Sequence, residues 1–281
     1  MPPHTDTPDG DVQVFPRYLA TSTGTGDPAL DPLLRIGWNL NHDDLNNAFV
    51  AAPDHKVRVG YLPEIDDDGL WRVTAYHDAF GSPAWSAWFN DSCPTEFVTA
   101  FTTALGEAYQ QGPDTYLAGP GTMGRKVPDP LPVITPLLAR GWRIDHPHWD
   151  AFAVQSPDEL ATLQYATGDL DPEAELTTRE TRWELFAGPP DRPYWYATAS
   201  TNTPTILLKA VTECISDPAP LPRWRQETHS YVGGKAQLTP IRSPAPSPLD
   251  VRTIARRPNT QPATSAPRWS TTSRIATGSR R

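Results

Sequence analysis

The feature that most constrains this chain is an internal duplication. Pro32-Leu-Leu-Arg-Ile-Gly-Trp38 recurs as Pro136-Leu-Leu-Ala-Arg-Gly-Trp142, and this offset of 104 residues keeps Pro, Leu, Leu, Gly and Trp. Matches continue in the same order on both sides, from Tyr18-Leu-Ala20 with Tyr116-Leu-Ala118 to Pro94-Thr95 with Pro204-Thr205. Self-similarity at a fixed distance predicts that the chain folds as two copies of one module.

The duplication divides the chain into four parts. We predict a first repeat at 15–112 and a second at 113–240, between a disordered N-terminus at 1–14 and a disordered basic tail, rich in Pro, Arg, Ser and Thr, at 241–281. The offset grows to between 110 and 112 in the later matches, so the second copy contains an insertion near Gly168 to Thr181. Its acidic stretch, Asp169 to Glu180, is expected to be a charged loop or a short helix.

Both copies show the same order of predicted elements. A short helix or turn comes first, at 27–36 and at 130–140, and a glycine and a tryptophan end it. Strand-like runs follow, in the first copy at 47–52, 56–62, 70–77 and 84–90, and an amphipathic helix closes each module. This order predicts an α+β fold of two tandem repeats, each a curved antiparallel sheet of about four to five strands with a C-terminal helix across one face.

Alternation along the strands separates two faces of each sheet. The apolar positions that recur in both copies are predicted to face the helix and form the core. In the first copy they are Val57, Val59, Tyr61, Trp71, Val73, Ala75, Trp85 and Ala87. In the second copy they are Ala161, Leu163, Tyr165, Trp183, Leu185, Ala187, Trp195 and Ala197.

The opposite face mixes polar side chains with large aromatic ones. We take it as the candidate binding face, with Arg58, Arg72, Tyr76, Trp88, Phe186, Tyr194 and Tyr196. Such a face suits the stacking of nucleobases or the docking of another polypeptide. A second explanation is that the two modules, or two copies of the chain, pack these faces together. That explanation is favoured, because partly apolar sheet faces are usually covered.

The net charge of −9 is unevenly distributed. Residues 242–281 hold eight arginines against one aspartate, so this tail carries +7 and the rest of the chain −16. Since a basic tail attracts polyanions and an acidic body repels them, we expect any nucleic-acid affinity to lie in the tail. The candidate polyanion-binding residues are Arg252, Arg256, Arg257, Arg268, Arg280 and Arg281.

The cysteine count and the length of the apolar runs indicate the cellular compartment of the protein. Two cysteines, Cys93 and Cys214, are too few for a secreted disulfide framework and lack the spacing of a zinc site. The opening residues have no basic and no apolar region of a secretion signal, and no run is long enough to span a bilayer. We therefore expect a cytoplasmic protein with no membrane partner.

No residue pattern predicts catalysis. His146, His148 and Asp150 are a conceivable metal site, but solvent-exposed loop histidines are the favoured interpretation of so undemanding a spacing. Cys93, at a predicted helix start, suits either a reactive thiolate or an inert capping position, and the second is commoner. Nucleophile elbows, phosphate loops and dinucleotide fingerprints are missing. We predict no catalytic residue, no cofactor and no metal.

Several short motifs resemble an actinobacterial family known only as domain of unknown function 317. In the first copy they are Arg17-Tyr-Leu-Ala20, Gly37-Trp38, Val57-x-Val59-Gly-Tyr61-Leu-Pro63, Leu70-Trp71-Arg-Val-Thr-Ala-Tyr76 and Gly81-x-Pro83-Ala-Trp85. In the second they are Ala153-Val-Gln-Ser-Pro-Asp158, Gly168-Asp-Leu-Asp-Pro172, Trp195-Tyr-Ala-Thr-Ala199 and Pro222-Arg-Trp224. The resemblance covers about 15–240 and implies a tandem pair of the domain. It implies no activity, ligand or catalytic residue.

Two functions remain open, and both are binding functions. The first is a protein-interaction or scaffold module, whose aromatic face meets an unknown protein partner or a second copy. The alternative is a nucleic-acid-binding protein that uses the face aromatics and the arginine-rich tail. The body charge opposes this alternative unless its cations gather in one patch. Those cations are Arg58, Arg72, Lys209, Arg223 and Arg225.

Overall fold

The computed structural model describes residues 11–63, 70–117, 127–148, 150–177, 181–224 and 234–241, with 146–148 as backbone only. The chain divides into two units, 1–241 and 242–281. The second unit contains the predicted basic tail, and it lies outside the described residues.

The two repeats have matching elements. The first contains α1 (Asp27–Arg35), β2 (Asn39–His42), β3 (Ala48–Ala51), β4 (Val57–Tyr61), β5 (Trp71–Tyr76), β6 (Pro83–Phe89) and α2 (Thr95–Gln111). The second contains α4 (Leu131–Leu138), β7 (Arg143–His148), β8 (Ala151–Gln155), β9 (Ala161–Ala166), β10 (Trp183–Ala187), β11 (Trp195–Ala199) and α6 (Thr205–Ser216). The predicted α+β fold of two repeats, each with an antiparallel sheet and a closing helix, is confirmed, with five strands per repeat.

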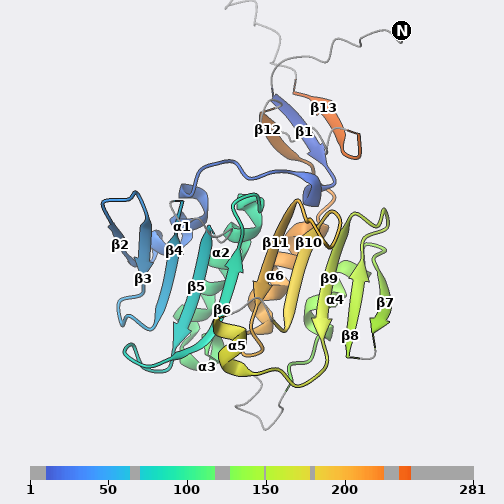
Figure 1. Ribbon diagram of the computed structural model, residues 1–281. Helices are drawn as coiled ribbons and strands as arrows, with labels where there is room; N and C mark the ends of the chain where they lie inside the picture. The colour runs from blue at the N-terminus through green and yellow to red at the C-terminus, as the bar shows by residue number, and fades with distance from the viewer. Residues whose placement is uncertain are drawn as a thin grey trace, which may run out of the picture. The chain divides into compact units, whose positions relative to one another are not determined.

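The two five-stranded sheets are joined into one. Its strand order is β2-β3-β4-β5-β6-β11-β10-β9-β8-β7, with β6 and β11 antiparallel at the junction (Figure 1). Trp88 lies opposite Thr198, its own equivalent 110 residues later, so a pseudo-two-fold axis passes through this pair. Asn90 N donates to Tyr196 O at 3.1 Å and, reciprocally, Ser200 N donates to Ser86 O at 3.0 Å. The repeats therefore meet edge to edge as symmetric halves.

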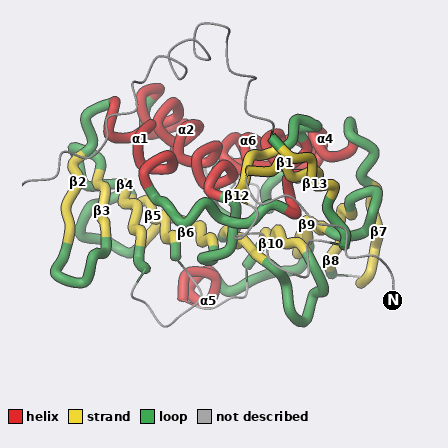
Figure 2. Tube along the Cα trace, turned by 90° about the horizontal axis from the view of Figure 1, so that it is seen from above, coloured by secondary structure: helices red, strands yellow, loops and turns green. Residues whose placement is uncertain are grey.

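The core lies between the sheet and four helices. These helices all lie on one side of the sheet, where α1 packs on α2, α2 on α6 and α6 on α4 (Figure 2). Of the positions predicted to face inward, all are buried except Tyr61, which is partly exposed. Equivalent hydroxyls tie the helices together, because Thr102 Oγ1 donates to Ala29 O at 2.6 Å and Thr212 Oγ1 donates to Val133 O at 2.7 Å. The duplicated letters are thus core positions.

A short arm from each repeat packs on the other repeat. In η1 (Arg17–Leu19), the carbonyl of Tyr18 accepts a bond from Trp195 Nε1 at 2.8 Å. In α3 (Pro113–Tyr116), the carbonyl of Tyr116 accepts an equivalent bond from Trp85 Nε1 at 2.8 Å. Since Tyr18 matches Tyr116 and Trp85 matches Trp195 in the duplication, the two repeats exchange their arms. The N-terminal arm consequently completes the second repeat.

A second, small sheet corrects the predicted disordered N-terminus. β1 (Asp11–Phe15) lies between β12 (Leu221–Trp224) and β13 (Gln237–Pro240), antiparallel to both. Val12 and Val14 are buried, so the prediction of disorder up to residue 14 is wrong for residues 11–14. Arg223 of β12 is also buried and binds both carboxylate oxygens of Glu96 on α2, at 2.7 and 2.5 Å. This ion pair connects the small sheet to the helix layer.

Candidate binding face and junction pockets

One face of the ten-stranded sheet is not covered by the four core helices. Of the described helices only α5 (Pro172–Thr177) lies on this side (Figure 2). Because the repeats are joined side by side, the expectation that they pack these faces against each other is wrong. A single row of cross-strand neighbours crosses the whole face: Asn41, Phe49, Gly60, Arg72, Trp88, Thr198, Glu184, Gln164, Ala153 and Asp145.

The first-repeat half of the face carries two arginines above aromatic rings. The Arg72 guanidinium lies 4.1 Å from the centroid of the Trp88 ring, and that of Arg58 lies 4.7 Å from the Tyr76 ring. Arg58 Nη2 also donates to Ala79 O at 2.7 Å. Both arginines are exposed, whereas both rings are partly buried. Each pair contributes about 0.5–1 kcal/mol. The four predicted residues thus form two pairs on the same face of the sheet.

The second-repeat half differs in chemistry. Phe186 is only 5% exposed, between its cross-strand neighbours Tyr196 and Thr162, so its prediction as part of an exposed binding face is wrong. Tyr194 packs on Gly188 and accepts a bond from Lys235 Nζ to its hydroxyl at 2.7 Å. The structure thus separates the predicted face into an arginine-aromatic half and a tyrosine half.

Two pockets lie at the ends of the β6–β11 junction. The first, which we call the α5 pocket, has about 500 Å³ and is lined by residues such as Pro83, Glu175, Arg182 and Asn202. The second, the tyrosine pocket, has about 410 Å³ and is lined by Asn90, Ser92, Glu184, Pro190, Asp191, Arg192, Pro193, Tyr194, Tyr196 and Thr198. Both volumes are in the range of small-molecule or side-chain sites.

Buried charges in the α5 pocket hold the insertion in place. Both Glu175 oxygens accept bonds from Thr201, one from its backbone N and one from its hydroxyl, at 2.6 Å for the hydroxyl. Arg182 Nε donates to the same hydroxyl at 3.0 Å, and its Nη1 donates to the carbonyls of Ala166 and Gly168. Glu175 and Arg182 are 3% and 2% exposed. Their polar atoms therefore serve the fold. In the sequence, the acidic insertion was the one feature that pointed to these buried charges.

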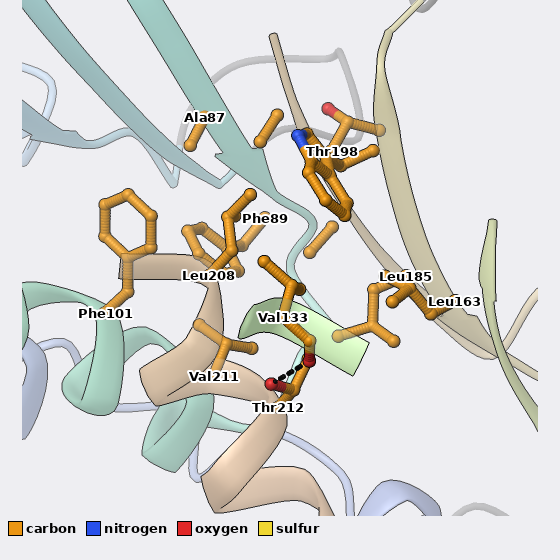
Figure 3. Close-up of a pocket in the computed structure, with 13 residues that line it drawn as sticks. Ala87, Phe89, Phe101, Val133, Leu163, Leu185, Thr198, Leu208, Val211 and Thr212 are labelled. Carbon is orange, nitrogen blue, oxygen red and sulfur yellow. Dashed lines mark hydrogen bonds between the residues drawn. The ribbon is translucent and has the colours of Figure 1, made fainter. Parts of the chain in front are cut away.

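A third cavity lies inside the core. It is lined by apolar side chains of the sheet and of α6, with Phe89, Leu163, Leu185 and Val211 among them (Figure 3). The volume of about 30 Å³ has room for a water molecule and for nothing larger. This cavity is not a candidate ligand site.

Comparison with known proteins identifies the repeats. Residues 51–111 and 155–221 each match the family model of the SPDY domain, a domain of unknown function (DUF317). The chain contains a tandem pair of DUF317 domains. Each matched segment runs from the middle strands of a repeat to its closing helix. Neither the curated proteins nor the solved structures gave a match.

Several predicted candidates lie away from the face of the DUF317 pair. Lys209 is on α6 and pairs with Glu213, and Arg223 is buried against Glu96, so these cations do not join Arg58 and Arg72. Arg225 and all the tail arginines lie outside the described residues. The side chains of His146 and His148 do too, and Asp150 is exposed. In the described part of the chain, no group of His, Cys, Asp and Glu is arranged to hold a metal ion.

The two cysteines of the DUF317 pair are free thiols in protected places. Cys93 is buried, and burial raises its pKa well above the usual range. Burial also raises the pKa of Cys214, although the nearby Arg17 guanidinium lowers it. A raised pKa disfavours the reactive thiolate, which supports the inert interpretation of Cys93. None of the helices described is long and apolar enough to cross a membrane.

Proposed function

We propose that this tandem pair of DUF317 domains is a protein-binding module whose docking surface is the sheet face around Arg72 and Trp88, opposite the four core helices. The observation that carries the proposal is the pair of exposed guanidinium groups held over Tyr76 and Trp88. A side chain already ordered by a ring loses less entropy on binding. Arginine and aromatic residues also supply most of the binding energy in protein interfaces.

The distribution of charge along the face supports a protein partner. Arg72 and Glu184 occupy equivalent places on either side of the Trp88–Thr198 axis, so the face has a basic and an acidic side. A polypeptide accommodates both signs in one interface, whereas a phosphate backbone requires one sign along its track. The face therefore suits a mixed-charge protein surface better than a nucleic acid.

The test compares charge reversals on the two sides of the sheet. Arg58→Glu and Arg72→Glu change the face, and Arg35→Glu is the matched control, because Arg35 is exposed at the end of α1 on the helix side. Each full-length variant is used as bait for chemical crosslinking in an extract of cells that make the protein. We expect the proteins crosslinked by the wild type to be lost with the face variants and kept with the control. An identical set for all baits would contradict the proposal.

Nucleic-acid binding is the second candidate, and the Arg72–Trp88 pair favours it, because such a pair can also stack on a base. Binding of single- and double-stranded oligonucleotides is measured at low salt, with the full chain and with a chain ending at residue 241. No binding by either chain eliminates this candidate. Binding by the full chain alone assigns the affinity to the tail, and binding by both chains that Arg72→Glu weakens assigns it to the face.

A further inference from the structure

The ten-stranded sheet ends in two equivalent strands, β2 and β7 (Figure 1). They match in the duplication, because Asn39-Leu-Asn-His42 lies 104 residues before Arg143-Ile-Asp-His146. Among the described strands, β2 pairs with β3 alone and β7 with β8 alone. The two outer edges of the sheet are therefore comparable position by position.

The β7 edge has features that prevent pairing with a further strand. Its register with β8 shifts between Asp145 and His148, around Pro147. The strand also carries two charged side chains, Arg143 and Asp145. Irregular pairing, proline and charge are the common protections of an edge strand. β7 is therefore a protected edge.

The β2 edge lacks these protections. Its register with β3 is regular from Asn39 to His42, and both charged positions of β7 are asparagine in β2. All four residues of β2 are exposed, and the apolar Leu40 is 41% exposed. A regular edge strand without lysine, arginine, carboxylate or proline is a template for pairing with another strand.

The hydrogen bonds next to β2 show which of its backbone groups point outward. Asp43 N donates to Asn47 O at 3.2 Å, so these two residues form a hydrogen-bonded pair. Such pairs alternate along an antiparallel ladder, so Asn41 bonds to β3, whereas Leu40 and His42 do not. The N–H and C=O groups of Leu40 and His42 therefore point away from β3.

These outward groups lie symmetrically about Asn41. An antiparallel copy of β2, with Asn41 opposite the partner's Asn41, places each Leu40 opposite a His42 and allows four backbone hydrogen bonds. Side chains alternate, so the two Leu40 side chains become diagonal neighbours on the helix side, and the two Asn41 amides meet on the other face. β2 is thus complementary to a copy of itself.

We propose that β2 pairs with β2 of a second copy of the chain, about a two-fold axis at Asn41, and so joins two ten-stranded sheets into one. The β6–β11 junction is the precedent within the chain, because there two DUF317 repeats already meet edge to edge about the Trp88–Thr198 axis. A second copy is favoured over an unstructured segment of another protein, because its β2 is already ordered and loses less entropy on pairing.

The small size of this contact sets the strength of the dimer. Only a short strand of each copy takes part, so the dimer is expected to be weak and to form with increasing concentration. Pairing of this kind keeps the helices of both copies on one side of the sheet, as the internal junction does (Figure 2). Both faces around Arg72 and Trp88 then lie on the other side, where one partner with two binding sites gains avidity. The dimer itself does not depend on the proposed protein-binding function.

Matched charge substitutions at the two edges test the assignment. Leu40→Lys and Ile144→Lys change equivalent positions of similar exposure, 41% and 45%. In sedimentation equilibrium, the mass of the full-length wild type should rise with concentration from one chain towards two. Leu40→Lys should weaken the dimer about tenfold, since the two lysines become neighbours beside the axis, and Ile144→Lys should leave it unchanged.

Three results of this measurement would overturn the proposal. The first is a wild type that keeps the mass of one chain up to millimolar concentration. The second is a Leu40→Lys variant that dimerises as the wild type does. The third is loss of the dimer in Ile144→Lys alone, which would place the contact at β7.

A cysteine at the axis tests the register. In a cross-strand pair without hydrogen bonds the two Cα atoms are about 4.5 Å apart, within the range of a disulfide. Oxidised glutathione should therefore link Asn41→Cys to its copy, as seen by non-reducing electrophoresis, whereas the wild type with its two free cysteines stays a single chain. Asp44→Cys is the control, because Asp44 is exposed beyond the end of β2. Equal linkage of Asp44→Cys, or no linkage of Asn41→Cys, would refute pairing about Asn41.

Discussion

The two repeats agree in the interior and differ on the open face. Both bury a tryptophan at the start of the last strand, and each tryptophan bonds to the arm of the other repeat. On the face, Arg72 and Trp88 in one repeat stand where Glu184 and Thr198 stand in the other. Burial tolerates few changes of size or polarity, whereas an open face does not restrict them. The interior therefore explains how the chain folds, and the differences on the face indicate where it acts.

Truncating the paired tryptophans is expected to have the largest effect. Trp85→Ala and Trp195→Ala each remove a side chain at most 2% exposed, together with its hydrogen bond. Each should lower the free energy of unfolding by about 3–5 kcal/mol. Urea unfolding followed by circular dichroism measures this, and Trp224→Ala, at a 45% exposed site, should change little. A much smaller loss for one of the pair would show that the repeats are not equivalent in the core.

Removing the arms tests whether they are exchanged. Tyr18→Ala should lower the free energy of unfolding by about 3 kcal/mol and expose the core of the second repeat to solvent. This is expected although Tyr18 belongs to the first repeat in sequence. In hydrogen exchange, amides of β10 and β11 should lose protection first. Tyr116→Ala should affect β5 and β6 in the same way. Faster exchange of β5 and β6 in Tyr18→Ala would mean that the N-terminal arm does not complete the second repeat.

Buried tyrosines make the protein sensitive to alkali. Burial raises the pKa of Tyr116 and that of Tyr165 to about 12, from 10.0 in the unfolded chain. The unfolded state therefore loses these protons first, and stability is complete below pH 10 and decreases up to pH 12. Each tyrosine should account for about 2 kcal/mol of this decrease. Stability measured against pH should fall less steeply in Tyr116→Phe and in Tyr165→Phe, and unchanged slopes would contradict the assignment.

The same two variants should differ at pH 7. The Tyr165 hydroxyl donates a hydrogen bond to Pro128 O at 2.7 Å, so Tyr165→Phe should lower the free energy of unfolding by about 1 kcal/mol. The Tyr116 hydroxyl is buried and has no partner at hydrogen-bond distance among the described residues, although the Asp54 carboxylate is near enough to raise its pKa. Tyr116→Phe should therefore change the free energy of unfolding less than Tyr165→Phe does. Chemical unfolding at neutral pH distinguishes them.

An effect as small as that of Tyr165→Phe is expected at the equivalent threonines. Thr102→Val and Thr212→Val each remove a hydroxyl bond to the neighbouring helix and should cost about 1 kcal/mol. Thr103→Val is the control, because Thr103 is exposed and bonds only within its own helix. Thermal unfolding should show equal losses of stability for Thr102→Val and Thr212→Val. Unequal losses would reveal a difference between the repeats that the backbone does not show.

The elements and faces of each repeat were predictable, because alternation along a strand and helical spacing are local properties of the sequence. The β6–β11 junction was not, since any edge strand offers the same backbone donors and acceptors and side-chain patterns do not name the partner. The exchange of Tyr18 and Tyr116 was missed for a similar reason, because it depends on contacts between distant segments. β1 was missed although Val12 and Val14 alternate correctly, because its polar, proline-rich surroundings predicted disorder.

The candidate site was predicted in part. Alternation placed Arg58, Arg72, Tyr76 and Trp88 on one face correctly, since that assignment needs only the strand period. It could not indicate that Phe186 is buried, because burial depends on what lies over a face. Neither pocket was predictable, because each is built from both repeats at a junction that the sequence does not reveal.

The pair Trp88 and Thr198 has a further consequence. In a complex of two identical single-repeat chains, the residue on the symmetry axis would meet a copy of itself, and every change there would occur twice. Linking both copies in one polypeptide removes this restriction, so a tryptophan can face a threonine and an arginine can balance a glutamate. The covalent link is thus what allows the centre of the face to be asymmetric, and an asymmetric surface can bind one partner in a single orientation.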